Sequence, residues 1–185
     1  MTAADSQAAH VRDVVAAGGT VDSILPIAEH LQRFRASLPK IDSLSHASSS
    51  IDARVARWAR AVSTRDTASL NAMVLDRAEF AWLYYPGSRM SMPPYEAPPE
   101  LLWGQILVSS DEGARRMLAR HGGRPLRVTA LACPDSVEIE GVNRVRQNCT
   151  VALRSSDTPL PPNRYFGSII ERDGRFKFLS MANRL

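Results

Sequence analysis

The pattern of hydrophobic and polar residues changes character near Pro125. Before this proline, apolar residues mostly recur every three or four positions, which predicts amphipathic helices. After it, apolar and polar residues alternate, which predicts strands. Helices followed by an antiparallel series of strands, instead of alternating with them, are typical of the α+β class.

The first clear helical pattern lies in residues 21–38, with the apolar set Ile24, Ile27, Leu31, Phe34 and Leu38. We expect an accessory helix that docks on the domain, or alternatively a helix that binds a partner. Residues 1–20 are expected to be a flexible N-terminus with at most a weak helix near 7–17. Residues 40–50 are a Ser-rich linker or loop, so that 21–50 precede a domain at 51–185.

Helix-start signals follow the linker. Ser49 or Ser50 can cap a helix that runs to about Ser63, because a serine side chain accepts a hydrogen bond from an otherwise unpaired amide. Asp66 can cap a short helix over 67–75. Farther along, one helix is predicted from the prolines at 98 and 99 to about 107. Another is predicted from Ser109-Ser110-Asp111 to His121, closed by Gly122-Gly123.

The stretch 79–103 holds a dense group of aromatic residues and prolines. Apolar side chains with a period of two predict a strand over 79–85 whose faces are both covered. Proline pairs at 93–94 and 98–99 then hold the connection in extended form. The aromatic side chains are either plain core or the ligand-binding wall of one pocket. Under the second interpretation the ligand-binding residues are Phe80, Trp82, Tyr84, Tyr95 and Trp103.

The last third of the chain predicts two hairpins. Asp173-Gly174 between alternating runs is the stronger signal, because a type I′ turn needs positive φ at both positions. It predicts three opposed pairs: Arg172 with Arg175, Ile169 with Phe178, and Phe166 with Met181. A sheet face left to water would be polar, but both faces here are apolar. We therefore expect the face with Ile170 and Leu179 to be covered by the 21–38 helix or by a second subunit of a homodimer.

Two cysteines flank the other predicted turn, near Gly141. A three-residue loop, 140–142, would place Cys133 directly opposite Cys149, close enough for a disulfide. A two-residue Glu-Gly turn would point the two sulfurs to opposite faces, and the alternative role is two small buried hydrophobic residues. A disulfide would indicate an oxidising compartment, and hence export with the signal removed; otherwise the protein is cytoplasmic.

Charge and composition exclude several classes of partner. The net charge is +4, but the arginines are scattered and form no dense basic patch, so nucleic-acid binding is not expected. No apolar run approaches the roughly 20 residues that span a bilayer. The first ten residues lack the basic start and apolar core of a secretory signal. Two cysteines are too few for a Cys-x-x-Cys metal site, and no motif calls for a metal or cofactor.

Three segments within residues 51–185 are distinctive: VARWARAVSTRD, EFAWLYYP and the closing hairpin FGSIIERDGRFKFLSMANRL. Together they resemble a known family, the nuclear transport factor 2-like (cystatin-like) superfamily. The loop PPYEAPPELLW and the turn HGGRPL are similar to uncharacterised bacterial proteins. The resemblance implies helices packed into the concave face of a curved antiparallel sheet, which leaves a cone-shaped pocket. Because the superfamily includes enzymes, transport factors and binding proteins, this fold does not specify a function.

Enzymes of that superfamily place a carboxylate in the cone, and the candidates here are Glu79, Glu96 and Asp76. Each could instead be a helix cap, a loop anchor or one half of a salt bridge. We expect a protein that binds a small, largely apolar molecule without a cofactor. The alternatives are a cofactor-free isomerase, dehydratase or hydrolase, and a dimeric scaffold whose cone is filled by its own side chains.

Overall fold

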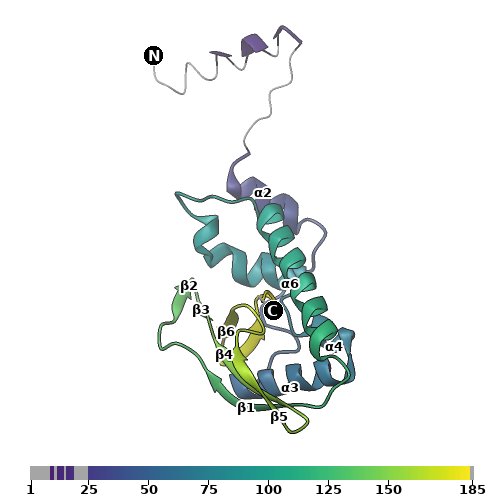
Figure 1. Cartoon of the computed structure of the whole chain (residues 1–185). Coiled ribbons are helices and arrows are strands. Elements are labelled where there is room, and N and C mark those ends of the chain that lie inside the picture. The colour runs from purple at the N-terminus through teal and green to yellow at the C-terminus, as the bar shows by residue number, and fades with distance from the viewer. Residues whose placement is uncertain (1–8, 11, 15, 19–24, 184–185) are drawn as a thin grey trace.

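The computed structural model describes residues 9–10, 12–14, 16–18 and 25–183. The described chain is an α+β protein in which helices precede two antiparallel sheets (Figure 1). Most of the predicted flexible segment 1–20 lies outside the described residues. Residues 9–10, 12–14 and 16, which are described, are helical.

Two helices in the first half of the chain begin where the sequence predicts them, after Ser50 and after Asp66, whereas the accessory helix occupies only part of the predicted range 21–38. The accessory helix is α2 (Ile27–Arg35). Helix α3 (Ile51–Thr64) is capped by Ser50, whose Oγ accepts from the amide of Ala53 at 3.1 Å. Helix α4 (Thr67–Ala72) is capped by Asp66. These caps are local hydrogen bonds, which explains why the sequence alone reveals them.

The predicted strand over 79–85 is wrong. Residues Arg77–Glu79 form α5, Phe80–Tyr84 a π-helix (η1), and Tyr85–Gly87 and Arg89–Ser91 two 3-10 turns (η2, η3). Every side chain from Phe80 to Tyr85 is buried except that of Trp82, which is partly buried. A run covered on all sides fits a period of two or of 3.6 equally well. The capping box between Asp76 and Glu79 was the overlooked signal for a helix start.

The two helices predicted for 98–121 form one helix, α6 (Pro99–His121), so the predicted restart at Ser109 is wrong. The Oγ of Ser109 donates back to the carbonyl of Gln105 at 2.7 Å within the helix, instead of capping a new one. The Oγ of Ser110 accepts from the amide of Met181 at 3.2 Å. Serine is tolerated inside a helix when its hydroxyl bonds to the preceding turn.

The strands form two antiparallel sheets, not the single curved sheet expected. One has three strands in the order β1 (Leu126–Ala132), β4 (Thr150–Ser155), β5 (Thr158–Asn163). The other has four, in the order β2 (Glu138–Glu140), β3 (Asn143–Arg146), β6 (Ile169–Arg172), β7 (Arg175–Phe178). The run of residues that follows the turn near Gly141 is divided between the two sheets as β3 and β4. The coarser predictions, the α+β class and the antiparallel pairing, are confirmed.

The closing hairpin has the predicted register. Ile169 lies opposite Phe178, and Arg172 opposite Arg175, across a turn in which Asp173 and Gly174 both have positive φ. Gly167 and Ser180 continue the pairing beyond the strands through a backbone hydrogen bond of 3.0 Å.

Two clusters of buried side chains form the core. The first joins α3 and α4 to both sheets, and Phe166 makes aromatic contacts with both Trp58 and Phe178. The second gathers Phe34 of α2, Phe80 of η1 and the hairpin residues Ile170 and Leu179. Ile170 and Leu179, on the second face of the hairpin, are therefore buried within the chain, in a cluster that also holds residues of α2 and η1.

Candidate ligand pocket between α4 and α6

A pocket of about 580 Å³ opens between α6 and the segment that runs from α4 to the start of α5. Trp103, Ile106, Leu107 and Ala114 contribute one wall from successive turns of α6. The opposite wall and the floor are formed by Leu70, Asn71, Val74, Leu75, Asp76, Arg77 and Met181. Val108, Ser110 and Asp111 complete the lining.

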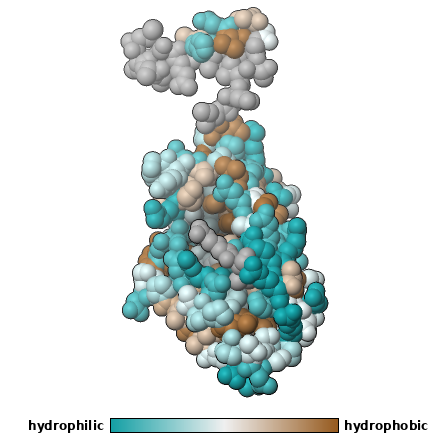
Figure 2. All heavy atoms as spheres, viewed as in Figure 1, coloured by the Kyte–Doolittle hydropathy of each residue, from teal (hydrophilic) through white to brown (hydrophobic). Residues whose placement is uncertain are grey.

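The walls of this pocket are mainly apolar and partly open to solvent. Leu107 is 53% exposed and Val108 59% exposed, although both are aliphatic. Figure 2 shows hydrophobic side chains near α2 and the start of α6, whereas the far end of α6 is mostly hydrophilic. Exposed aliphatic groups beside a concavity are a common feature of ligand sites.

Only a few polar groups enter the pocket. The Asp76 Oδ1 atom accepts from the amide of Glu79 at 2.8 Å, and no ion pair involves Asp76 among the described residues. The Arg77 guanidinium lies 4.5 Å from the centre of the Phe34 ring. Asp111 is paired with Arg115, its neighbour one turn along α6. Asp76 is therefore the one candidate catalytic carboxylate that lines this pocket.

Glu79 lies outside the pocket and is fully buried. Its carboxylate accepts from Lys177 Nζ at 2.6 Å, from the amide of Ser45 at 2.6 Å and from the amide of Asp76 at 2.8 Å. The Oγ of Ser45 donates a further bond at 2.9 Å. These contacts join the 40–50 segment, the start of α5 and β7, so Glu79 acts as a structural anchor.

Glu96, the third candidate carboxylate, is exposed in the proline-rich loop before α6, where it adopts a positive φ of 41°. Its backbone amide donates to the carbonyl of Met92 at 3.1 Å. Glu96 does not line the pocket, and its place is that of a turn residue.

The five aromatic candidates do not share one cavity wall. Trp103 lines the pocket and contacts Phe80, with 5.3 Å between ring centroids, but Phe80 itself is fully buried. Trp82 lies under the Arg35 guanidinium at 4.1 Å, and Tyr95 is 53% exposed. Tyr84 packs against Phe80, and burial, together with the Glu140 carboxylate, raises the pKa of its hydroxyl well above the ordinary range. Among the five, therefore, only Trp103 reaches the pocket.

Sequence reasoning missed most of the pocket wall. The α6 residues Trp103, Leu107, Ser110 and Ala114 follow a helical spacing of three to four positions, which was a usable signal. The predicted helix break at Ser109 concealed this spacing. Only the tertiary fold brings the lining residues of α4 and Met181 next to α6.

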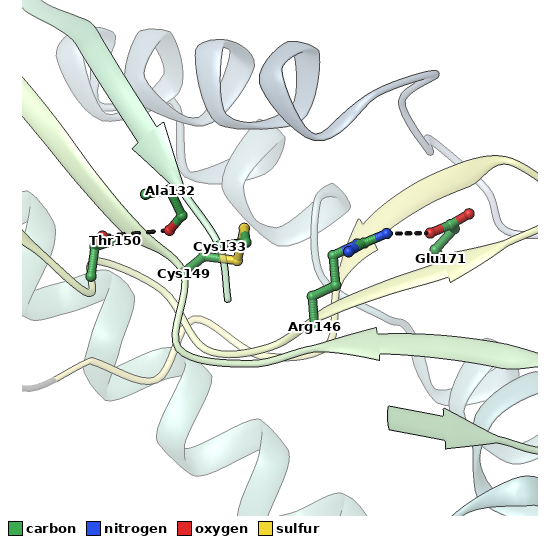
Figure 3. The surroundings of a disulfide bond; sticks show 6 residues. All are labelled: Ala132, Cys133, Arg146, Cys149, Thr150 and Glu171. Carbon is green, nitrogen blue, oxygen red and sulfur yellow. Dashed lines mark hydrogen bonds and ion pairs between the residues drawn. A yellow bond between two sulfur atoms is a disulfide. The ribbon is translucent and has the colours of Figure 1, made fainter. Parts of the chain in front are cut away.

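The predicted disulfide between Cys133 and Cys149 is present, at the point where β1 and β4 meet (Figure 3). Beside it, Thr150 Oγ1 donates to the carbonyl of Ala132 at 3.4 Å. Both turns considered in the sequence analysis are wrong, because Glu140 pairs with Asn143 across a two-residue Gly141-Val142 turn. The segment 134–137, between Cys133 and Glu138, is one residue longer than the segment 146–148, between Val145 and Cys149. This extra residue shifts the register between the two sheets, so that the two cysteines lie opposite each other.

Comparison with known proteins provides no family assignment. No family model, curated protein or solved structure matches the chain. Within residues 25–183 and the short described segments before them, no three His, Cys, Asp or Glu side chains cluster to hold a metal ion. In the same part of the chain, no helix is long and apolar enough to cross a membrane.

Proposed function

We propose that the protein binds a small, largely apolar molecule in the pocket between α4 and α6, without a cofactor. The volume of about 580 Å³ falls in the range of small-molecule sites, roughly 300–1,000 Å³. The observation that carries the proposal is the lining itself: aliphatic and aromatic walls with few polar groups. Such a lining favours a ligand that is mostly hydrocarbon and has one or two polar atoms.

We infer a distant relation to the nuclear transport factor 2-like superfamily, in which helices and a curved sheet enclose a cone. The α+β class, the antiparallel strands and the closing hairpin support this relation. The pocket proposed here differs from a cone, because helices and the segment after α4 supply nearly all of its wall.

A matched pair of substitutions on α6 tests the pocket. Leu107 lines the pocket and is 53% exposed, whereas Leu101 lies outside it and is 56% exposed. Leu107→Lys should weaken binding because an ammonium group would have to be desolvated beside apolar walls. Leu101→Lys adds the same charge to the same helix without entering the pocket, so binding should be unchanged.

The measurement is native mass spectrometry after incubation with mixtures of apolar fragments and lipids, followed by titration of any retained molecule. We expect at least about a tenfold weaker affinity in Leu107→Lys, which corresponds to roughly 1.4 kcal/mol. Equal affinities in the two variants, or no retained molecule in the unmodified protein, would contradict the proposal.

A cofactor-free reaction at Asp76 is a second candidate function. The position of this carboxylate in the pocket, without an ion-pair partner among the described residues, supports it. Asp76→Asn keeps the helix cap, because asparagine caps helices about as well as aspartate does. A retained ligand that changes mass in D₂O with the unmodified protein but not with Asp76→Asn would support catalysis. No mass change in either protein would contradict it.

We also propose that the protein works in an oxidising compartment, a proposal supported by the disulfide between Cys133 and Cys149. Intact mass after alkylation of the unfolded protein, purified without reductant, tests it. No alkylated thiol is expected, and two alkylated thiols would contradict the proposal.

A further inference from the structure

A second pocket, of about 380 Å³, has a different chemical character. Four parts of the chain meet there: α6, the connection from β3 to β4, the segment from the end of β5 to β6, and the C-terminal segment after β7. Its described lining residues are Ser109, Arg116, Gln147, Asn148, Asn163, Arg164, Phe166, Gly167, Ser168, Ala182 and Asn183. The proposed function makes no use of this pocket.

The charge of this lining has one sign. It includes two guanidinium groups, Arg116 and Arg164, and no Asp or Glu among the described lining residues. Two of the lining residues contact carboxylates that are not part of the lining. Glu112 is 3.6 Å from Arg116 Nη1, and Glu138 accepts from Gln147 Nε2 at 2.7 Å. An anion inside the pocket would therefore face positive charge without a carboxylate in the wall.

The hydrogen bonds within the lining use side-chain acceptors and leave several N–H donors without a partner among the described residues. Arg164 Nη1 donates to Asn148 Oδ1, which positions the guanidinium and leaves the Asn148 amide hydrogens without a partner among the described residues. The backbone amide of Arg164 donates to Asn163 Oδ1 at 2.8 Å, which likewise uses the acceptor of that side chain and leaves its donor. The Nη2 and Nε atoms of the Arg164 guanidinium have no partner among the described residues. Several donors, with no carboxylate among the described lining residues, suit an oxyanion.

Arg116 has a different role from Arg164. Its Nη2 donates to the Asn183 carbonyl at 2.9 Å, and its Nε donates to Asn183 Oδ1 at 3.3 Å. These bonds attach the C-terminal segment to α6, so Arg116 both supports the pocket wall and contributes charge to it. Arg164 is exposed and makes no comparable contact with the core, so it is the better residue to substitute.

We propose that this pocket binds a small ligand through an oxyanion group, a phosphate or a carboxylate, held by Arg164 and the neighbouring asparagine amides. A guanidinium pairs with such groups through two parallel hydrogen bonds. The volume exceeds that of the oxyanion alone, and the remaining wall of carboxamides, Ser168 and Phe166 suits a hydroxylated body. The ligand class is therefore a phosphorylated or acidic sugar-sized molecule.

Three probes of similar size test the ligand class by calorimetric titration: glucose 6-phosphate, gluconate and glucose. We expect saturable binding of at least one of the two anionic probes and none of glucose, since the charged group provides the contact with Arg164. The stronger of the two anions identifies the oxyanion. Binding of glucose as tight as that of the anions, or no binding of either anion, would overturn the proposal.

Arg164→Gln should weaken binding of the anionic probe by about tenfold or more, the usual effect of losing one charge-assisted hydrogen bond. Arg175→Gln is the matched control, because it removes one exposed arginine at the tip of the closing hairpin, outside this pocket. Thermal melts of both variants check that the fold is unchanged. Equal weakening in the two variants would indicate a general charge effect and would overturn the site.

Discussion

At the scale of single residues, the most unusual feature is a group of buried charges beneath the 40–50 segment. Glu79 and Lys177 form an ion pair at 2.6 Å, with side chains 0% and 1% exposed. Arg54 is also fully buried and donates to the carbonyls of Phe176 and His46. Burial and, to a smaller extent, the neighbouring Arg57 lower the pKa of Arg54 to about 10, while Glu79 opposes the shift. The hydrogen bonds of Glu79 and Arg54 hold the Ser-rich segment 40–50 to β7.

Lys177→Met should lower the free energy of unfolding by about 3–5 kcal/mol, because it leaves the Glu79 carboxylate buried without its cation. The double variant Glu79→Gln, Lys177→Met should lose much less than the sum of the two single variants, since neither charge is then left unpaired. Urea melts of all four proteins measure the coupling. Additive losses would show that the pair is not energetically coupled.

At the scale of elements, α6 depends on one glycine. A Cβ atom placed on Gly113 would lie 1.9 Å from the carbonyl oxygen of Met181, so α6 and the C-terminal segment approach too closely for any side chain. Asn183 stabilises the same contact, because its Nδ2 donates to the Gly113 carbonyl at 2.9 Å. Gly104, on the same helix, has no atom within 4 Å of the equivalent position.

Gly113→Ala should therefore destabilise the protein by at least about 1–3 kcal/mol, the usual cost of overpacking. Gly104→Ala should stabilise it by up to about 1 kcal/mol, because alanine is the better helix former and meets no obstacle. Denaturant melts of the two variants give the comparison. Similar stabilities for both would mean that α6 can move away from Met181 at little cost.

The disulfide belongs to the same scale, since it joins two strands where the chain passes between sheets. Replacing both cysteines by alanine should lower the free energy of unfolding by roughly 3 kcal/mol, the value expected for a closed loop of about this length. The control is the unmodified protein with reductant, which should show a comparable loss. A double variant as stable as the oxidised protein would show that the bond contributes nothing measurable.

At the scale of the whole molecule, α2 packs against η1 and joins the buried cluster that includes Phe80, Ile170 and Leu179. Phe34 is 3% exposed and meets Phe80 at 5.8 Å between ring centroids, and Arg35 donates to the carbonyl of Ala81 at 2.7 Å. In the absence of this helix, an aromatic and aliphatic face would be open to water. Such a face promotes association.

Removal of residues 1–40 should lower stability and cause self-association, measured by denaturant melts and by light scattering coupled to size-exclusion chromatography. Phe34→Ala in the full chain is the milder control, with an expected loss of about 3 kcal/mol. A truncated chain that stays monomeric and equally stable would contradict the covering role of α2. The prediction of a homodimer through the closing hairpin is examined in the same chromatography of the full chain.

The amino-acid sequence by itself determined the features that depend on residues a few positions apart. Ser50 and Asp66 cap their helices, and Asp173-Gly174 sets the register of the closing hairpin. These features rest on local hydrogen bonds and turn geometry, which the residue types already specify. The α+β class follows from the same local periodicities, because they separate the helical part of the chain from the strands.

Tertiary structure decided the helical state of 79–87, the division of 142–155 between two sheets, and both pockets. The aromatic run is apolar on every side, so its period is ambiguous until its neighbours are known. Each pocket wall combines segments far apart in the sequence, as where Leu70 of α4 and Met181 meet α6. Local patterns specify which residues are apolar or charged. Only the packing of distant elements brings them around a common space, because burial rewards contacts irrespective of sequence separation.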